Sequence, residues 1–358
     1  MSDHTPSLSV VMPLYNVGQF LDETLSTIAC QTFRDYEVIM VDDGSTDDTA
    51  AIAKRRVEED DRFRYVFQEN SGAACARNNG MSEANGKYLC FLDGDDLFDR
   101  RMFERMASSL EETNADLCLC KYSEFDSKTG NRLPAVGPYP ALRGLHKAED
   151  YLGRLFQDIS DQPWDKMYRR DFVLASGVKF QNIAASNDLF FTKVTLALSS
   201  RAYFLDQSLV SYRVASGTSI QDKKIKHPTC AMMAMKAVYE EAKRRNILAP
   251  ICESFRFAYS SALNSCAALV ADKAPEFLGE ALQLWRDVEK DFEKSISTSL
   301  GLGHAILFWL RRRCFSRATV GKLTWVYAGG ARSRTDGAPS ALSKVKLAVR
   351  LFVAGFNT

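Results

Sequence analysis

The sequence predicts an α/β fold in which helices flank a mainly parallel sheet on both faces. Over the first 120 of the 358 residues, strand patterns and amphipathic helix patterns alternate at short intervals. Three of the strand patterns end in short polar stretches, "PLYN", "DDGS" and "DGDD". After about residue 222 the helical pattern dominates, so the predicted class includes a mostly helical C-terminal extension.

The predicted elements follow one another in a regular order. Apolar runs rich in β-branched and aromatic residues predict strands at 8–15, 36–43, 63–68 and 87–93. Helical spacing of apolar residues predicts helices at 20–31, 49–60, 72–85 and 100–110. Ser45 opens "STDD", a capping-box pattern before the second helix, and Gly86 ends the third. Because parallel sheets bind ligands beyond the carboxyl ends of their strands, the polar stretches predict a site there.

The change of pattern along the chain predicts two domains. Residues 1–221 form the sheet domain, with a first half at about 1–120 and a second half of mixed elements at about 121–221. Residues 222–358 form a helical region. No internal repeat and no low-complexity segment interrupts either part.

Cysteine usage and the absence of long apolar runs predict a cytoplasmic protein. The nine cysteines are scattered without a CxxC pair, and Cys118 and Cys120 are spaced as neighbours on one face of a strand. We therefore expect reduced, buried thiols and no zinc site. The polar start predicts no signal peptide, and no apolar run approaches the roughly 18 residues of a membrane span.

The charge is uneven along the chain. Net charge is +1, but residues 301–358 hold ten Lys and Arg against one acid, a local +9. An apolar face formed by Leu342, Val345, Val349, Phe352 and Val353 has Lys344, Lys346 and Arg350 off it. The pattern is typical of a helix lying in a membrane interface and equally of a helix packed on the sheet domain. The charge favours an anionic membrane surface, and no nucleic-acid partner is expected.

The acids after the fourth predicted strand are too many for one structural role. Asp96 or Asp99 could cap the following helix, but that explains one acid and not the cluster with Asp93 and Asp95. Like charges this close need a cation, and hard divalent ions prefer such oxygen ligands. With further acids at Asp42 and Asp43 and at Asp188, a divalent cation bridging Asp95 to a diphosphate is the consistent arrangement.

The motifs, taken in order, resemble a known family. "VVMPLYN", "VDDGSTDDT", "NSGAACARNNG" and "FLDGDD" are similar to the motifs of family-two glycosyltransferases, and "PWDKMYRRDFV", "NDLFF" and "YRVASGTSI" extend the likeness over about 8–220. The resemblance implies an inverting enzyme with a Rossmann-like GT-A fold, of the bacterial polysaccharide or cell-envelope type. It also implies a nucleotide-binding first half and an acceptor-binding second half.

The resemblance implies roles for individual residues. Asp43 would accept a hydrogen bond from the base, most plausibly uracil, Arg77 and Asn78 would flank the nucleotide or support its loop, and Asp93 would lie on the ribose side. The whole expected donor set is Pro13, Tyr15, Asn16, Asp42, Asp43, Asn70, Gly72, Arg77, Asn78, Asp93, Lys166 and Arg213. The expected ligands of Mn²⁺ or Mg²⁺ are Asp95 and Asp93, and the expected acceptor-side residues are Trp164 and Asn187.

The implied reaction needs a base that takes the proton of an acceptor hydroxyl. Asp188 matches the second acid of the family's "ED" pair, and a single displacement inverts the anomeric centre without a covalent intermediate. The sequence departs from the pattern at Asn187, which stands where the family has Glu. An amide cannot accept a proton at neutral pH, so the base is placed on Asp188.

Structural alternatives stand beside several of these roles. Asp188 could cap the following helix, and Asp42 could simply fix the "DDGS" turn. Trp164 could be a core residue, and Lys166 could pair with a neighbouring acid instead of the diphosphate. Arg213 is expected in a lid over the diphosphate, with a surface salt bridge as the alternative.

Other functions fit the sequence less well. A sugar nucleotidyltransferase would carry a Gly-rich basic loop after the first strand, and "PLYNVGQF" has no Lys or Arg. A haloacid-dehalogenase phosphatase would have its Asp-x-Asp after the first strand, not the fourth. The third alternative is a degenerate transferase that serves as a scaffold. It stays open because Asn187 replaces an acid of the family pattern. The predicted partners are thus a nucleotide-sugar, with a UDP-sugar as the expected donor, and a glycan acceptor, with a lipid-linked glycan as one form. No motif specifies an oligomeric state.

Overall fold

The computed structural model describes residues 5–127, 129–132, 142–214, 227, 229–270 and 275–299. The first half contains the predicted alternation, with elements β1 (Leu8–Leu14), α1 (Gly18–Ala29), β2 (Tyr36–Asp42), α2 (Thr49–Glu59), β3 (Phe63–Phe67), α3 (Ala73–Glu83), β4 (Tyr88–Phe91), β5 (Leu97–Phe98) and α4 (Met102–Thr113). All eight predicted strands and helices of this half are present, which confirms that part of the prediction.

The second half is mixed, as predicted. Its elements are β6 (Leu117–Asp126), β7 (Gly144–Lys147), α5 (Ala148–Tyr151), a 3₁₀ turn (Leu152–Arg154), α6 (Leu155–Asp158), β8 (Lys166–Arg169), α7 (Arg170–Ser176), α8 (Asn187–Leu198) and β9 (Arg201–Val214). Three long helices follow, α10 (Cys230–Arg244), α11 (Leu248–Val270) and α12 (Pro275–Ser299).

The strands form one sheet in the order β3-β2-β1-β4-β8-β6-β9-β5, and β7 pairs with β9. β3, β2, β1 and β4 are mutually parallel. β8 runs antiparallel to both β4 and β6. The chain leaves β1 first toward β2 and β3 and then returns to its other side as β4, so the order reverses beside β1. In open α/β sheets a ligand site lies at such a reversal, beyond the carboxyl ends of the strands.

Helices cover both faces of the sheet because β1 and β2 are apolar on both sides. Val10 and Met12 of β1 pack in a core with α1 and α4, whereas Val11 packs on the opposite face in a core with α3 and α8. Gly80 lets α3 lie directly on this second face, since a Cβ there would come within 2.5 Å of Val11 Cγ1. Cys118 and Cys120 of β6 are both buried in the first core, as their spacing predicts.

One predicted helix end is wrong, and one structural alternative, the capping of α4, does not hold. α3 stops at Glu83 and not at Gly86, and Gly86 is needed instead because a Cβ there would lie 2.5 Å from the Ser9 nitrogen of β1. Neither Asp96 nor Asp99 caps α4, whose N-cap residue is Arg101, without a side-chain hydrogen bond. The carboxylate of Asp99 accepts a hydrogen bond from the Arg101 backbone at 2.9 Å in the turn before the helix.

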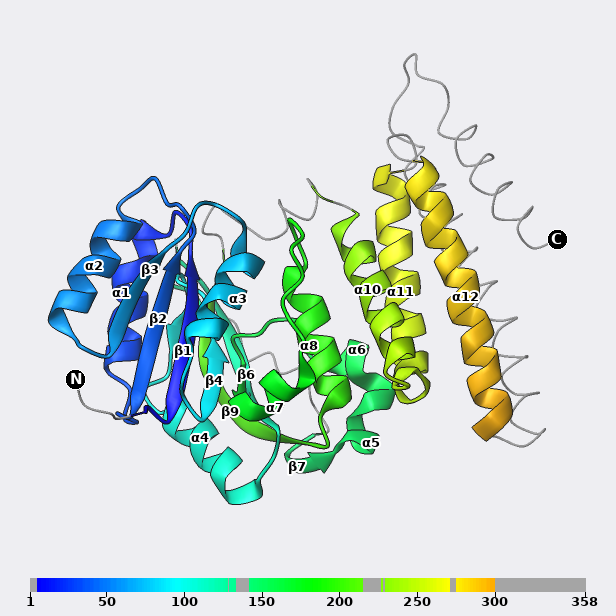
Figure 1. Cartoon of the computed structure of the whole chain (residues 1–358), viewed down its shortest axis with the longest axis horizontal. Coiled ribbons are helices and arrows are strands. Elements are labelled where there is room, and N and C mark those ends of the chain that lie inside the picture. Colours follow the sequence, from blue (N-terminus) through cyan, green and yellow to red (C-terminus); the bar gives the residue numbers. More distant parts are fainter. Residues whose placement is uncertain are drawn as a thin grey trace, which may run out of the picture.

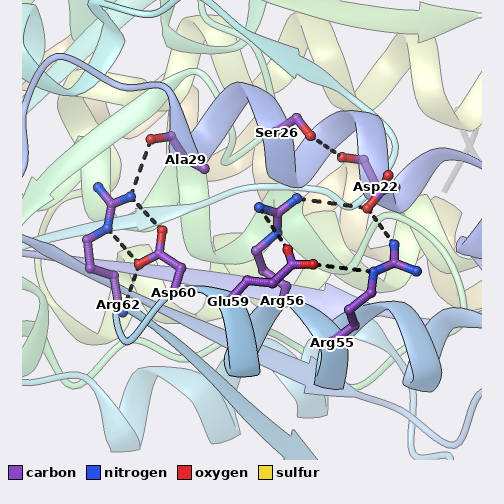
Figure 2. A network of polar contacts seen from close by, with 8 residues as sticks. All are labelled: Asp22, Ser26, Ala29, Arg55, Arg56, Glu59, Asp60 and Arg62. Carbon is purple, nitrogen blue, oxygen red and sulfur yellow. Dashed lines mark hydrogen bonds and ion pairs between the residues drawn. The ribbon is translucent and has the colours of Figure 1, made fainter.

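Surface ion pairs link α1 to α2 (Figure 2). Arg55 contacts Asp22 of α1 at 2.8 Å, and Arg55 and Arg56 both contact Glu59 within α2. The side chains of Arg55, Asp22 and Glu59 are at least half exposed, whereas that of Arg56 is mostly buried. Exposed ion pairs contribute at most about 1 kcal/mol each to stability. We therefore expect this network to add little to the stability of the fold.

The helices α10, α11 and α12 lie side by side at the end of the molecule away from α1 and α2 (Figure 1). They share one hydrophobic core with α8 and the adjoining sheet face, through Val238 of α10, Phe255 of α11 and Val288 of α12. Among the described residues, none of the helices has both the length and the apolar character needed to cross a membrane. The predicted basic amphipathic end, 301–358, lies outside the described residues.

Candidate active site

The loops after β1 and β2 are tied together at the carboxyl edge of the sheet. The Asn16 N–H donates to Ser45 Oγ at 3.0 Å, and the Asn16 side-chain oxygen accepts from the Thr46 N–H at 2.8 Å. Asn16 takes a left-handed conformation here, with φ 52°. The predicted capping box is therefore wrong: α2 has Asp48 at its N-cap without a side-chain hydrogen bond, because the Ser45 hydroxyl serves the β1 loop.

Asp42 fixes the turn after β2. Its two oxygens accept from the Ser45 N–H at 2.9 Å and from the Tyr65 hydroxyl at 2.7 Å, and the carboxylate is buried. Burial and this hydrogen bond raise the pKa of Tyr65. In the same turn Gly44 has φ 74°, and a Cβ there would lie 3.0 Å from the backbone nitrogen of the exposed Asn70. The geometry fits the turn-fixing alternative for Asp42.

Asp43 holds the loop that leads into α3. Its carboxylate accepts from Gln68 Nε2 at 2.7 Å, from the Ser71 N–H at 2.8 Å and from the Gly72 N–H at 2.9 Å. Gly72, with φ 92°, is the N-cap residue of α3. A carboxylate has about four acceptor positions, and these three donors fill three of those of the buried Asp43. Tyr15, which follows β1, presents a ring that is 49% exposed and open to stacking, and Pro13 lies just before it in β1.

Arg77 joins β4 to α8. Its guanidinium, buried in α3, donates to Asp93 Oδ1 at 2.7 Å and to Asn187 Oδ1 at 3.2 Å, and lies 5.4 Å from the centre of the Phe180 ring. A buried guanidinium with one carboxylate partner holds that carboxylate in a fixed place. Arg77 therefore brings the predicted ribose-side acid and the predicted acceptor-side amide to one point.

Asn78, the next residue, supports a neighbouring loop. Its side-chain amide donates to the Phe180 carbonyl at 2.9 Å, and its oxygen accepts from the Phe180 N–H at 2.9 Å. The reciprocal pair fixes the loop between α7 and α8 against α3. Of the two roles predicted for Asn78, this contact fits loop support.

Arg213 of β9 fixes the segment that follows β4. The Arg213 N–H donates to Asp96 Oδ1 at 2.9 Å, Nε donates to the Asp95 carbonyl at 2.6 Å, and the guanidinium pairs with Glu23 of α1 at 2.7 Å. Arg213 is buried and lies on the rings of Phe20 and Phe125. Arg213 is thus buried, so its ion pair with Glu23 is not the exposed surface salt bridge of the alternative. The rest of the motif in which the lid over the diphosphate is expected, residues 215–220 of "YRVASGTSI", lies outside the described residues.

Asp96 is a buried acid of this segment that sequence reasoning assigned only to capping. Burial and the charges of Asp95 and Asp93 raise the pKa of its carboxyl well above the ordinary value, and the hydrogen bond from Arg213 opposes that rise. Its Oδ2 atom has no hydrogen-bond partner among the described residues. The sequence does contain a sign of this burial. Asp96 is followed directly by the apolar pair "LF", which forms the short strand β5.

The predicted metal ligands fit a divalent cation that is shared with a diphosphate. Asp93 and Asp95 are half-buried at the sheet edge and offer hard oxygen donors. In the described part of the chain no group of three or more His, Cys, Asp or Glu side chains could hold a metal alone. Mg²⁺ in particular is commonly held by one or two carboxylates, with substrate phosphates completing its shell. The pair Asp93 and Asp95 therefore fits such a site.

Asp188 lies in the first turn of α8, beside Asn187. Desolvation of the half-buried carboxyl raises its pKa to about 6, the positive charge of Arg77 opposes this rise, and the charges of Asp161 and Asp93 add to it. The predicted capping alternative is wrong, because α8 begins at Asn187 and its N-cap residue is Ser186. Perturbed carboxyls of this kind cluster at functional sites.

Lys166 and Trp164 lie near this edge but are engaged elsewhere. The fully buried Lys166 ammonium donates to Asp165 at 2.6 Å and to the Gln162 carbonyl at 2.7 Å, and burial lowers its pKa. Trp164 is buried against Tyr122 and Tyr212, with ring centres 4.8 Å and 5.5 Å away. These contacts fit the alternatives, the neighbouring-acid pair for Lys166 and the core position for Trp164.

Comparisons with known proteins agree on one family. A family model described as "Glycosyl transferase family 2" matches residues 9–173. The glycosyltransferase GlyG of Streptococcus pneumoniae is 40% identical over 218 residues, which cover 59% of this chain and 72% of GlyG. The uncharacterized glycosyltransferase YibD of Escherichia coli is 32% identical over 216 residues, covering 59% of this chain. The matched region spans only 62% of the length of YibD.

Solved structures show the same fold. TarS 1–349 of Staphylococcus aureus, in complex with UDP-GlcNAc, aligns with a TM-score of 0.63 at 19% identity, over 81% of each chain. The mannosyltransferase PcManGT of Pyrobaculum calidifontis, in complex with GDP-Man and Mn²⁺, aligns with a TM-score of 0.54 at 20% identity, over 82% of this chain and 85% of that one. The GT-A fold predicted from the motifs is confirmed.

Proposed function

This chain belongs to glycosyl transferase family 2, and on that premise we propose that it transfers a sugar from a nucleotide-sugar to an acceptor hydroxyl, with inversion at the anomeric carbon. The proposed donor is a UDP-sugar, and the proposed acceptor class is a polysaccharide or envelope glycan, which includes lipid-linked glycans. The observation that carries the proposal is the Arg77 bridge, because it joins the acidic end of β4 to the first turn of α8.

The donor side is proposed to use the carboxyl edge of β1, β2 and β4. Tyr15 would stack on the base, the remaining acceptor position of Asp43 would take a base N–H, and Asp93, held by Arg77, would face the ribose. A bound Mn²⁺ or Mg²⁺ at Asp95 and Asp93 would stabilise the charge that develops on the leaving diphosphate. The TarS complex with UDP-GlcNAc supports a UDP-sugar, and the PcManGT complex with Mn²⁺ supports the metal.

The acceptor side is proposed to use Asp188 as the base. Its carboxylate would take the hydroxyl proton while the hydroxyl oxygen forms the new bond to the anomeric carbon and the diphosphate leaves. A base is most effective when its pKa is near the working pH, and desolvation brings that of Asp188 to about 6. One carboxylate suffices, because a single displacement forms no covalent enzyme intermediate.

We expect a screen of sugar nucleotides to show one donor class that stabilises the protein only in the presence of Mn²⁺ or Mg²⁺. A donor at about 100 times its dissociation constant adds roughly 2.7 kcal/mol to the free energy of unfolding. The same nucleotides with EDTA are the control. If no sugar nucleotide shifts thermal unfolding with either metal, the proposed function is wrong.

The rate of donor turnover should fall at acid pH with a midpoint near 6. Asp188 must be deprotonated to accept a proton, so its active fraction decreases as pH falls through the pKa of about 6 and is restored above it. Initial rates of donor hydrolysis between pH 4.5 and 8, at saturating metal, give the profile. Circular dichroism over the same range controls for unfolding. If the rate stays constant down to pH 5, a group other than Asp188 is the base.

A second candidate function is a degenerate transferase that acts as a scaffold. Asn187 favours it, since a neutral amide stands where the family pattern has an acid and Arg77 binds that amide. Metal-dependent hydrolysis of a UDP-sugar separates the two functions. Hydrolysis supports the enzyme, whereas tight donor binding without hydrolysis or transfer supports the scaffold.

We also propose the predicted division into 1–221 and 222–358, with the basic end attached to the inner face of the cytoplasmic membrane. The support is the sequence pattern of residues 301–358, with a local charge of +9. Each basic residue near an anionic leaflet contributes about 1 kcal/mol, which is screened by salt. α12, the last described helix, ends at Ser299, so a cut after residue 300 leaves every described element in place.

The full chain is expected to float with anionic liposomes at low salt and to stay in solution at high salt. The chain 1–300 should not float but should still hydrolyse donor. A matched variant of the full chain, with Lys344, Lys346 and Arg350 changed to Glu, should behave like the shortened chain, because only charge is altered. If the full chain fails to float at low salt, the basic end does not bind membranes.

A further inference from the structure

The side-chain amide of Asn187 has a fixed orientation. Arg77 Nη1 donates a hydrogen bond to the Asn187 side-chain oxygen at 3.2 Å. Because a guanidinium carries only donors, the amide atom that faces Arg77 must be the oxygen Oδ1 and not the nitrogen. The amide nitrogen Nδ2 leaves the same carbon on the other side, so it faces away from Arg77.

Arg77 is itself held by other contacts. Its Nη2 donates to Asp93 Oδ1 at 2.7 Å, and its guanidinium lies 5.4 Å from the centre of the Phe180 ring. That ring stacks on Phe191 of α8, with ring centres 4.1 Å apart. The Phe180 backbone is fixed by its two hydrogen bonds with the Asn78 side chain. The guanidinium is thus held in place independently of the amide, and it determines which way the amide turns.

The two N–H bonds of Asn187 Nδ2 are open to a ligand. Asn187 is half-buried, and within the described residues its Nδ2 donates no hydrogen bond. Asp188, the proposed base, is the next residue, and both lie in the first turn of α8. The pair therefore offers a glycan acceptor two different groups. One is a carboxylate that takes a proton, and the other is an amide that donates hydrogen bonds.

A hydrogen-bond donor at this position changes which groups can bind. The family's Glu, when ionised, can only accept hydrogen bonds, so it would face a carbonyl or carboxylate oxygen without a bond. A hydroxyl suits either residue, since it both donates and accepts. We propose that Asn187 donates from Nδ2 to a carbonyl or carboxylate oxygen of the glycan acceptor, beside the hydroxyl that reacts at Asp188. This inference rests on the proposed function, in which Asp188 is the base.

Two classes of sugar carry such an oxygen. An N-acetylated sugar has a carbonyl oxygen, a uronic acid has a carboxylate, and both oxygens accept hydrogen bonds without donating any. A carboxylate would form the stronger, charge-assisted bond. Asn187 adds no negative charge to a site that already holds Asp93, Asp95 and Asp188, so it repels an anionic group less than a Glu would.

Exchange of Asn187 for Asp separates the proposed role from a structural one. Asp keeps an oxygen for Arg77, so only the two N–H donors are lost. If the amide served merely to bind Arg77, the variant would be as active as the wild type. We expect instead that Asn187→Asp raises the KM for the glycan acceptor at least about tenfold and leaves the donor KM unchanged, because an oxygen of the acceptor would lose its only donor.

Asn85→Asp is the matched control for the added charge. Asn85 is exposed and lies before β4, at the opposite end of that strand from Asp93. The control should keep the wild-type KM for the glycan acceptor. The acceptor probes are methyl β-D-glucoside, methyl β-D-N-acetylglucosaminide and methyl β-D-glucuronide, used with the donor that the sugar-nucleotide screen identifies. They differ in one substituent, so they separate a hydroxyl, a carbonyl and a carboxylate.

The Asn187 amide can also be observed directly, without turnover. The full chain is labelled with ¹⁵N-asparagine, and the side-chain signal of Asn187 is identified by its loss in Asn187→Asp. Each of the three probes is added together with UDP and Mn²⁺. We expect the N-acetylated probe or the glucuronide to shift the amide protons of Asn187, and the glucoside to leave them in place. The side-chain signal of Asn85 should not move.

The outcomes decide between the inference and its alternatives. A shift with the N-acetylated probe assigns a carbonyl, and a shift with the glucuronide assigns a carboxylate. No shift with either probe, an equal shift with the glucoside, or an unchanged acceptor KM in Asn187→Asp overturns the inference. If Asn187→Asp fails to fold, Asn187→Ser identifies the signal and the probe titration alone decides. If the wild type transfers no sugar while the amide signal shifts as expected, the proposed function fails and the Asn187 site stands.

Discussion

Replacing Asp95 with alanine is expected to reduce sugar transfer to below about one thousandth of the wild-type rate. The change removes a proposed metal ligand, so the charge on the leaving diphosphate would lose its main stabilisation in the transition state. Removing a single stabilising group of this kind typically costs 10²–10³-fold, and a metal ligand supports more than one such contact. Transfer and donor hydrolysis, measured at saturating donor and metal, check the effect.

The fold should survive this substitution. Arg213 holds the segment through the carbonyl of Asp95 and the carboxyl of Asp96, and neither group is removed by Asp95→Ala. The thermal midpoint is therefore expected to stay within a few degrees of the wild type. Asp99→Ala is the matched control, an acid four positions further on whose carboxylate serves a turn. Full activity of Asp95→Ala at saturating donor would remove Asp95 from the metal site.

The first half of the fold could be predicted because its signals are local. The apolar residues of β1 face both sides of the sheet, Val10 one way and Val11 the other, and an uninterrupted apolar run indicates such a doubly covered strand. The cap of α2 could not be predicted in the same way. The sequence offers Ser45 to the helix, whereas the folded chain engages its hydroxyl with Asn16, 29 positions away.

Some contacts among the predicted site residues follow from the sequence, and others do not. Asp93 and Arg77 meet because α3 packs on β1, the strand that pairs with β4, so motif order and sheet topology suffice to place them together. Arg213 could not be placed, since its partner Glu23 lies 190 positions away and no local pattern connects them. The sequence leaves Lys166 open between the diphosphate and a neighbouring acid, because the motif does not indicate whether its side chain is buried. The structure surrounds it with Asp165 and backbone carbonyls.

The ion pair between Asp161 and Lys193 is a contact that sequence reasoning could not predict. Asp161 stands between two motifs, and a lone acid in a loop is ordinarily a solvated surface group. Only the folded chain places it against Lys193, because that contact depends on α8 crossing the segment before β8.

Asp188→Asn is expected to lower kcat by roughly 10²-fold or more while leaving donor binding unchanged, because an amide of the same shape cannot take a proton. The α8 helix should persist. Its N-cap residue is Ser186, and exchange of an acid in a first turn costs at most about 1 kcal/mol. Calorimetric binding of the nucleotide, measured beside the initial rates, separates the two effects.

Asp171→Asn provides the matched control for this prediction. Asp171 also lies in a first helical turn, that of α7, and its carboxylate accepts a hydrogen bond from the Phe172 backbone at 2.7 Å. It has no contact with the candidate site in the described part of the chain, so its substitution should change thermal stability slightly and kcat not at all. If Asp188→Asn behaves like Asp171→Asn, or weakens nucleotide binding without lowering kcat, the base must be sought elsewhere. In that case the neutral Asn187 would count for the scaffold function, since neither residue of the family's acid pair would then carry out proton transfer.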